Sequence, residues 1–492
     1  MRIVVIGSGF GGLAAAIRLR QQGHDVTIVE KRDKPGGRAY VYEQDGFTFD
    51  GGPTIITAPW LIHELFERSG RATSDYVQLV PIDPFYNIRF EDGTVFRYNG
   101  DRAAVIEQIR RVNPADVAGY LRFADATERI FDAGMALIDT PFDRISDMMK
   151  VLPDLVRLRA DRSVASFVNR YIQDPRLRQV FSFHPLLVGG NPFQSTSIYA
   201  LIHTLEQQWG VWFAMGGTGA LVRGLVRLFE EIGGVLRLDA EVAEITCDPA
   251  DRRATGLRLL DGTRLDADAV VSNGDVASTY MHLVPAALRR KNTDRRYERM
   301  RYSMSLFVLY FGTDRTYDDI AHHEILMGPR YEALLDDIFT AKSLSPDFSL
   351  YLHRPTATDP SLAPPGCDSW YVLSPVPHLG GQTDWRTAAR PYRDRIVSYL
   401  EERYLPNLSR HIVTEHMIDP LHFRDTLNSH LGSAFSVEPI LTQSAWFRPH
   451  NRSEDIPNLF FAGAGTHPGA GIPGVLSSGK IVAEMIGSGR ER

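Results

Sequence analysis

The chain has 492 residues, of which 43% are hydrophobic and 23% are charged, the composition of a globular protein with a large core. Its 54 basic and 60 acidic residues give a net charge of −6, which offers no electrostatic case for nucleic acid as a partner. The two cysteines exclude a disulfide framework and a cysteine-based metal site, and they favour a reducing, cytoplasmic location. No apolar run approaches the roughly 18–20 residues that span a bilayer.

The first predicted elements form a nucleotide-binding unit. Residues 2–7 form a short apolar strand, and a glycine-rich turn then leads into a run of helix formers. That turn fits G-x-G-x-x-G, with its glycines at Gly7, Gly9 and Gly12. The second strand, residues 26–29, ends at Glu30, whose carboxylate can accept hydrogen bonds from ribose hydroxyls and would repel the 2′-phosphate of NADP. Together these elements predict a dinucleotide whose pyrophosphate lies at the helix N-terminus.

Two further glycine pairs follow the second strand. The first, residues 36–37, precedes Arg38, which can meet phosphate charge, and the second follows a predicted strand at residues 47–50. The glycines expected to approach the dinucleotide here are Gly37, Gly51 and Gly52. The sequence resembles the flavoprotein superfamily of amine oxidases, carotenoid desaturases and GDP-dissociation inhibitors. The resemblance lies in the order of four motifs: the G-x-G-x-x-G turn, the acidic residue, G-G-R and D-G-G-P. The resemblance implies FAD, since NAD dehydrogenases lack the G-G-R element.

The middle of the chain predicts a β-hairpin at residues 85–98 and then helices from about residue 103 to residue 205. Within the helical part, residues 130–160 combine an apolar face with basic edges. This pattern suits a membrane interface, and the alternative is a pair of core-facing helices with solvated charges. Arg144 and Asp147 lie one helical turn apart in this stretch. We take them as a candidate pair for proton transfer, with an exposed ion pair as the alternative.

A second glycine-rich turn, at residues 215–219, precedes another predicted helix. We interpret it as a helix cap rather than a phosphate loop. Because no complete second dinucleotide motif exists, NAD(P)H is not expected as a co-substrate. In the superfamily, the strand that follows lays the backbone of a valine against the adenine, and here that residue is Val242. Residues 300–425 carry several apolar strands. His322 and His323, within them, are expected at the surface, and no pattern of histidines predicts a metal site.

The C-terminal part carries the most specific motif. Residues 458–466 form a strand that ends in glycines, and the run H-P-G-A-G-I-P-G-V follows at residues 467–475. This run closely resembles the signature of the bacterial and fungal type of phytoene desaturase, and the resemblance covers the whole chain. It implies a second contact with the flavin through a helix N-terminus. The expected contacts are Gly463, Ala464, Gly474 and Val475. Ala464 replaces the usual acidic residue, which removes one polar contact.

The resemblance implies an α/β fold of the amine oxidase and GDP-dissociation-inhibitor superfamily. It comprises a Rossmann-like FAD-binding domain, a mixed-sheet substrate domain and a helical, membrane-facing insertion. The expected segments are the FAD-binding domain at 1–100, 213–299 and 426–492, the insertion at 101–212, and the substrate domain at 300–425.

The resemblance also implies an activity. FAD is then the sole organic cofactor, with no metal, and 15-cis-phytoene and partly desaturated carotenes are the substrates on the way to all-trans-lycopene. Quinone or oxygen accepts the electrons, and the protein lies in the cytoplasm, attached peripherally to a membrane surface. Two alternatives remain: a related carotenoid desaturase or isomerase acting on another polyene, and a non-catalytic lipid-escort protein of the same fold. The intact motifs at both ends of the chain argue against the escort protein.

Overall fold

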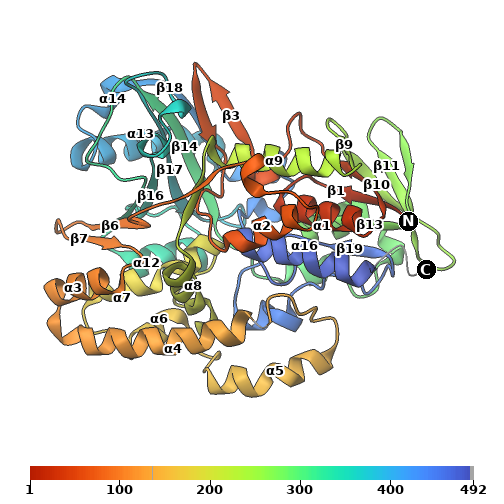
Figure 1. Ribbon diagram of the computed structural model, residues 1–492, viewed down its shortest axis with the longest axis horizontal. Helices are drawn as coiled ribbons and strands as arrows, with labels where there is room; N and C mark the ends of the chain where they lie inside the picture. The colour runs from red at the N-terminus through yellow and green to blue at the C-terminus, as the bar shows by residue number, and fades with distance from the viewer. Residues whose placement is uncertain (136, 488–492) are drawn as a thin grey trace.

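The structure is a computed structural model that describes residues 1–135 and 137–487 (Figure 1). One part is built on a five-stranded parallel sheet in the order β19-β13-β1-β2-β9. Its strands are β1 (Arg2–Ile6), β2 (Asp25–Val29), β9 (Val235–Arg237), β13 (Ala269–Ser272) and β19 (Leu459–Phe461). β1, β13 and β19 are almost entirely buried, as expected for parallel strands that are covered on both faces. The sheet therefore unites segments from the beginning, middle and end of the chain.

Helices lie beside this sheet (Figure 1). They are α1 (Phe10–Gln21), α2 (Pro59–Glu67), α9 (Gly217–Glu231) and α16 (Ile472–Ile486). α1 and α16 pack so closely that a Cβ added to Gly479 would come within 2.7 Å of the backbone nitrogen of Ala15. Only glycine allows this approach, which joins the two ends of the chain.

The glycine turn before α9 caps that helix. The backbone N–H of Gly219 donates to Oδ1 of Asp50 at 3.2 Å, and a Cβ on Gly217 would lie 2.7 Å from the same carboxylate. Burial raises the pKa of Asp50 to about 6. A side-chain carboxylate thus occupies the N-terminus of α9, which confirms that this turn is a cap rather than a phosphate loop.

The second part is built on a seven-stranded mixed sheet in the order β18-β14-β17-β16-β15-β6-β7. Its strands are β6 (Tyr86–Phe90), β7 (Val95–Tyr98), β14 (Ser305–Thr313), β15 (His323–Met327), β16 (Leu350–His353), β17 (Asp368–Val376) and β18 (Ile412–Ile418). Only β6 and β15 pair in parallel.

The predicted hairpin at residues 85–98 is confirmed as β6 and β7, but its place differs from the expected segment. The sequence assigns residues 1–100 to the FAD-binding domain, whereas β6 extends the seven-stranded sheet. Tyr86, Ile88 and Phe90 point inward from β6 and join the core of that sheet. The hairpin thereby covers β15, which would otherwise be an unpaired edge.

Shorter elements complete both parts. The small sheets contain β3 (Val41–Gln44) with β4 (Phe47–Asp50), β5 (Leu79–Pro81) with β8 (Trp212–Ala214), and β10 (Val242–Cys247) with β11 (Ala254–Leu259) and β12 (Arg264–Asp266). The remaining helices outside the insertion are α10 (Val276–Ser278), α11 (Asp294–Glu298), α12 (Tyr331–Asp336), α13 (Trp385–Arg403), α14 (Leu408–His411) and α15 (Pro420–Asp425).

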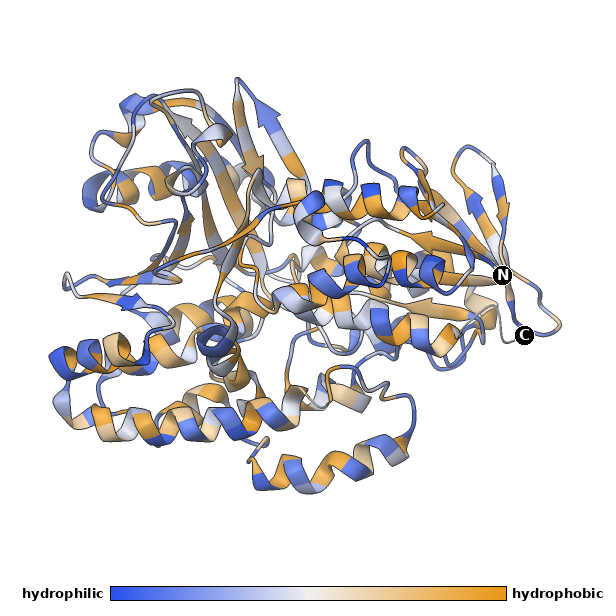
Figure 2. Cartoon of the chain, viewed as in Figure 1, coloured by the Kyte–Doolittle hydropathy of each residue, from blue (hydrophilic) through white to orange (hydrophobic). Residues whose placement is uncertain are grey.

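The helical stretch expected between about residue 103 and residue 205 is confirmed. It contains α3 (Arg102–Val112), α4 (Val117–Met135), α5 (Ile145–Arg157), α6 (Val164–Val168), α7 (Pro175–Ser182) and α8 (Leu201–Trp209). In Figure 1, α5 lies at the outer border of the molecule, and Figure 2 shows hydrophobic and hydrophilic residues alternating along it. Among the described residues, no helix is both long enough and apolar enough to cross a bilayer.

His322 and His323 are not at the surface, so that prediction was wrong. They are 5% and 0% exposed. The reason is the position of β15, which begins at His323 and lies inside the sheet between β16 and β6. Two polar residues in a row favour exposure locally, but the sheet order overrides that preference.

Candidate active site

A cavity of about 1140 Å³ lies where the parallel sheet, the seven-stranded sheet and the helical insertion meet. Nearly all the predicted cofactor residues line it. These are Gly7, Gly9, Glu30, Gly37, Arg38, Gly51, Gly52, Val242, Gly463, Ala464, Gly474 and Val475. Gly12 stands behind the wall, where a Cβ would come within 2.2 Å of the carbonyl oxygen of Gly7. Gly12 therefore allows the turn to pack closely and does not contact a ligand in the cavity.

Two helix N-termini border this cavity. The N-cap of α1 is Gly9 and that of α16 is Gly471, and no side chain caps either helix. Within the described residues, the first N–H groups of α1 and those of Ile472 and Gly474 in α16 therefore have no side-chain acceptor and can bind an anion, with the helix dipole adding positive potential. At Gly9 a Cβ would lie 2.8 Å from Oδ1 of Asn273, so only glycine leaves the backbone open there. These features fit a dinucleotide with a pyrophosphate.

Glu30 and Arg38 add charge to the nucleotide end of the cavity. Glu30 accepts hydrogen bonds from the backbone N–H of Ser8 at 2.9 Å, the Ser8 hydroxyl at 2.7 Å and the N–H of Arg32 at 3.1 Å. These bonds orient its carboxylate, which remains part of the cavity wall. Arg38 donates from Nη2 to the Ser429 hydroxyl at 2.9 Å, while its buried Nε has no hydrogen-bond partner among the described residues. Burial lowers the pKa of Arg38, and an anionic ligand would satisfy the free donor.

The C-terminal flavin motif is organised by residues that the sequence motifs do not include. Arg448 is 1% exposed, and its guanidinium donates to four backbone carbonyls. They belong to Val437 (3.0 Å), Gln443 (3.3 Å), Ala464 (2.6 Å) and Thr466 (3.1 Å). Asn273 donates from Nδ2 to the carbonyl of Ala462 at 2.7 Å and so ties the C-terminal strand to the first glycine turn. Neither role has a local signal, although Asn273 directly follows an apolar strand.

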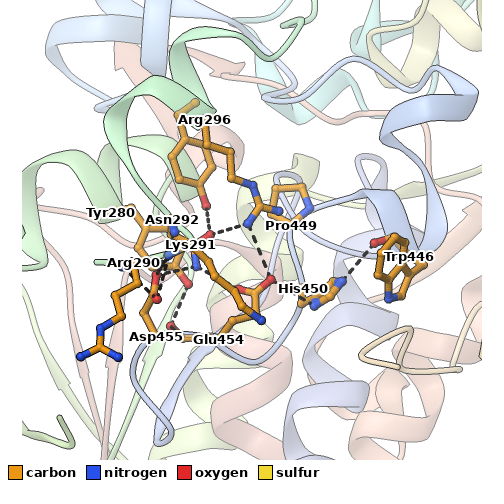
Figure 3. Close-up of polar contacts among 12 residues, drawn as sticks. Tyr280, Arg290, Lys291, Asn292, Arg296, Trp446, Pro449, His450, Glu454 and Asp455 are labelled. Carbon is orange, nitrogen blue, oxygen red and sulfur yellow. Dashed lines mark hydrogen bonds and ion pairs between the residues drawn. The ribbon is translucent and has the colours of Figure 1, made fainter. Parts of the chain in front are cut away.

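A polar network fastens the segment that carries this arginine (Figure 3). The carboxylate of Asp455 accepts hydrogen bonds from the backbone N–H groups of residues 290–292 at 2.8 to 3.0 Å. Glu454 accepts from Nδ2 of Asn292 at 2.9 Å and lies 3.3 Å from Nδ1 of His450. The network joins residues 290–292 to residues 450–455, which begin two residues after Arg448.

The other half of the cavity is apolar. Its wall comes from the insertion, from the seven-stranded sheet and from the loop after α7. The lining residues include Phe142, Met148, Val151, Leu155, Leu186, Ile198, Leu205, Met304, Leu306, Val308, Ile325, Met327, Leu350, Leu373 and Ile418. A chamber of this kind suits an apolar ligand, because burial of apolar surface stabilises a complex by about 25 cal/mol per Å².

The candidate proton-transfer pair is not brought to the cavity wall. Arg144 precedes α5 and is exposed, and Asp147 pairs with Lys150, Nζ to Oδ1 at 3.2 Å, rather than with Arg144. Neighbouring residues Met148 and Val151 do line the cavity. The expected Arg144–Asp147 ion pair is therefore corrected to Asp147–Lys150, and a catalytic role for either residue stays a prediction.

Comparison with known proteins agrees with this geometry. The family model of flavin-containing amine oxidoreductases matches residues 10–486. Two lycopene-forming phytoene desaturases are 53% identical over 490 residues, from Pseudescherichia vulneris, and 52% identical over 487 residues, from Pantoea ananas. The alignments cover 99% and 98% of this chain, and the same shares of the two relatives. The solved structure of an oxidoreductase from Methanosarcina mazei, 17% identical, superposes with a TM-score of 0.65 over 98% of this chain and 100% of that one.

The fold and the cavity are those of a flavoprotein oxidoreductase with FAD as its cofactor. The chain belongs to the flavin-containing amine oxidoreductases and, within them, to the bacterial-type phytoene desaturases.

Proposed function

We propose that the protein desaturates phytoene and carries the reaction toward lycopene in carotenoid biosynthesis. One observation carries the proposal: the glycine-rich dinucleotide cradle and the apolar chamber are two halves of the same cavity. The names of the two close relatives support this substrate. Phytoene is a hydrocarbon without ionisable groups, so a chamber lined by aliphatic side chains is the recognition it permits.

In this reaction the cofactor carries out the redox chemistry, and the side chains of the protein bind and position the substrate. Bound FAD supplies the hydride acceptor for an allylic C–H bond. The aliphatic wall holds a flexible chain against the cofactor and excludes water, which reduces the entropic part of the barrier. Asn273 and Arg448 fix the two loops on which the cofactor rests. This division of labour explains why no nucleophile or metal motif is needed.

The direct test is a reaction with purified protein, FAD, liposomes and phytoene, with products separated by chromatography. We expect stepwise growth of the conjugated system toward lycopene, with quinone or oxygen as electron acceptor and without NAD(P). An isomerase would change the geometry of the polyene without extending conjugation, and an escort protein would bind phytoene without a flavin spectrum. Strict dependence on added NADP would contradict the proposed electron flow.

We further propose that α5 docks on a membrane surface. Its outward side chains Ile145, Met149, Leu152 and Val156 are 56%, 61%, 41% and 65% exposed. The basic side chains of Lys150 and Arg157 are also exposed, at 75% and 73%. The opposite face lines the cavity, so the helix stands between the apolar chamber and its surroundings. A lipid-soluble substrate then enters next to the bilayer.

Replacing Ile145, Met149 and Val156 by serine is expected to weaken binding to anionic liposomes at least tenfold. Each side chain that leaves the bilayer forfeits roughly 1 kcal/mol of apolar burial, and 1.4 kcal/mol corresponds to a factor of ten. Flotation measures the binding, and the flavin spectrum should stay unchanged. Met148 is left intact because it lines the cavity. The matched control replaces three exposed apolar residues on other elements, Val95, Leu238 and Val413. Equal flotation of both triple variants would contradict docking through α5.

A further inference from the structure

Three histidines form a buried cluster behind the cavity wall. His322, His323 and His353 are 5%, 0% and 0% exposed, and His323 and His353 face each other across β15 and β16. Their ring centroids lie 4.4 to 5.1 Å apart. The Nε2 atoms of all three are buried and have no hydrogen-bond partner among the described residues. Buried polar atoms normally have a hydrogen-bond partner, so three neighbouring nitrogens without one need an explanation.

One side of the cluster reaches the substrate cavity. Nδ1 of His323 lies 2.6 Å from the hydroxyl of Tyr351, and that hydroxyl lies 3.2 Å from Oγ1 of Thr54. Thr54 is also 2.5 Å from the hydroxyl of Tyr371. Tyr351, Thr54 and Tyr371 all line the cavity. These hydroxyls are a polar spot in a wall that is otherwise mostly aliphatic.

The other side of the cluster reaches a second pocket. Nδ1 of His322 lies 2.6 Å from Oγ1 of Thr358, and both residues line a pocket of about 690 Å³. Its border includes Asp83, Thr316 and Asp318, which are exposed, so this pocket is open to solvent. The cluster therefore stands between the substrate cavity and water.

A divalent metal ion is the competing occupant, because the facing nitrogens lie within 4.8 Å of one another. Charge gives a metal ion little support, because the charged side chain acting on His322 is the Arg354 guanidinium, whose partners are Asp318 and Asp368. Burial lowers the pKa of all three histidines, that of His322 to about 3, so they are neutral. A neutral imidazole accepts a proton on one nitrogen while it releases one from the other, which suits proton transfer without a buried charge.

We propose that Tyr351 and the three histidines conduct the substrate proton from the cavity to the second pocket. The proposal rests on the proposed function. Each desaturation breaks C–H bonds on two adjacent carbons. One hydrogen leaves as hydride to FAD, and the other leaves as a proton, whose electron pair forms the new double bond. That proton cannot escape through hydrocarbon and lipid.

The transfer follows the contacts in order. The Tyr351 hydroxyl takes up the proton as it passes its own proton to Nδ1 of His323. Within the cluster, Nδ1 of His323 also lies 3.3 Å from Nδ1 of His353, and rotation of the closely packed rings passes the proton on to His322. From His322 it leaves through the second pocket to solvent. Tyr351 borders the cavity and is the catalytic residue of this proton path. The histidines act through Tyr351.

The test uses the FAD-loaded protein with phytoene in liposomes. Tyr351→Phe and His322→Ala should lower kcat by about 100-fold or more, since general acid–base catalysis contributes roughly 10²- to 10⁴-fold, with KM and flavin content unchanged. Because His322 borders the open pocket, added imidazole should restore the His322→Ala variant in proportion to its concentration. Thiazole, a ring of similar size but far weaker basicity, should not restore it. Tyr392→Phe is the matched control, a buried tyrosine bonded to Ser374 away from the cavity.

Several results would overturn the proposal. These are a parental kcat in His322→Ala, a lowered kcat that imidazole fails to raise, and one equivalent of zinc that is bound by the parent and lost in His353→Ala. If His322→Ala does not fold, His322→Gln replaces it in the measurement of kcat, and a parental kcat in that variant also contradicts the proposal. A parent that binds FAD but makes no product contradicts the proposed function itself. An active parent with an equally active variant contradicts the proton path alone.

Discussion

Replacing Gly9 by valine is expected to abolish FAD binding while the protein stays folded. Gly9 has φ −68° and ψ 171°, a conformation that any residue adopts, so the backbone is not strained. The added side chain instead occupies the space at the N-terminus of α1, where a Cβ already lies 2.8 Å from Oδ1 of Asn273. A pyrophosphate then loses its approach to the free N–H groups of the helix.

The measurement is the flavin absorbance per protein after gel filtration, together with the thermal unfolding of the cofactor-free forms. Gly9→Ala should give an intermediate loss, because only the Cβ is added. Gly70→Asn is the matched control, since a Cβ at Gly70 meets nothing within 4 Å and asparagine tolerates its φ of +67°. A valine variant that keeps a full complement of FAD would show that the cofactor does not lie against this turn.

Replacing Arg448 by methionine is expected to destabilise the protein by about 1–3 kcal/mol for each buried carbonyl that is left without a donor, and to weaken FAD binding strongly. The guanidinium donates to four carbonyls, two of which belong to the flavin motif at residues 464–466. Methionine fills much of the space but leaves these buried acceptors without donors. Arg448→Lys keeps the positive charge but makes fewer directed hydrogen bonds. Its stability and its affinity for FAD should therefore lie between those of the parent protein and of Arg448→Met.

Denaturant unfolding of the cofactor-free forms gives the stability, and titration with FAD gives the affinity. A variant with a lowered stability but an unchanged affinity would show that the C-terminal loop does not depend on this arginine. Removal of the exposed ion pair between Arg110 and Glu107 serves as the control, since exposed ion pairs contribute little to stability.

The glycine motifs at both ends of the chain could be predicted because their signals are local. A turn, a following helix and a terminal acidic residue lie within about 25 residues of sequence, and the structure places Gly7, Gly9 and Glu30 in one wall. Arg448 and Asn273 could not be predicted in the same way. Their partners are carbonyls that become neighbours only when distant segments fold together.

The histidine cluster and α5 show two further limits. His322 and His323 look hydrophilic in sequence, but they are buried by strands that lie both before and after them in the chain. For α5 the periodicity predicts an amphipathic helix correctly, yet only the tertiary fold determines that Met148 faces inward and Met149 outward. Residue 136, within the predicted stretch at 130–160, lies outside the described residues.

The joining of α1 and α16 has a consequence for how the protein is made. A ribosome synthesises residues 463–475 after every other segment that lines the cavity. The newly made chain consequently exposes its first nucleotide turn for most of translation, with neither Ala462 to hold Asn273 nor α16 to cover α1. The complete cradle for the dinucleotide can therefore form only once these last segments of the chain have been made.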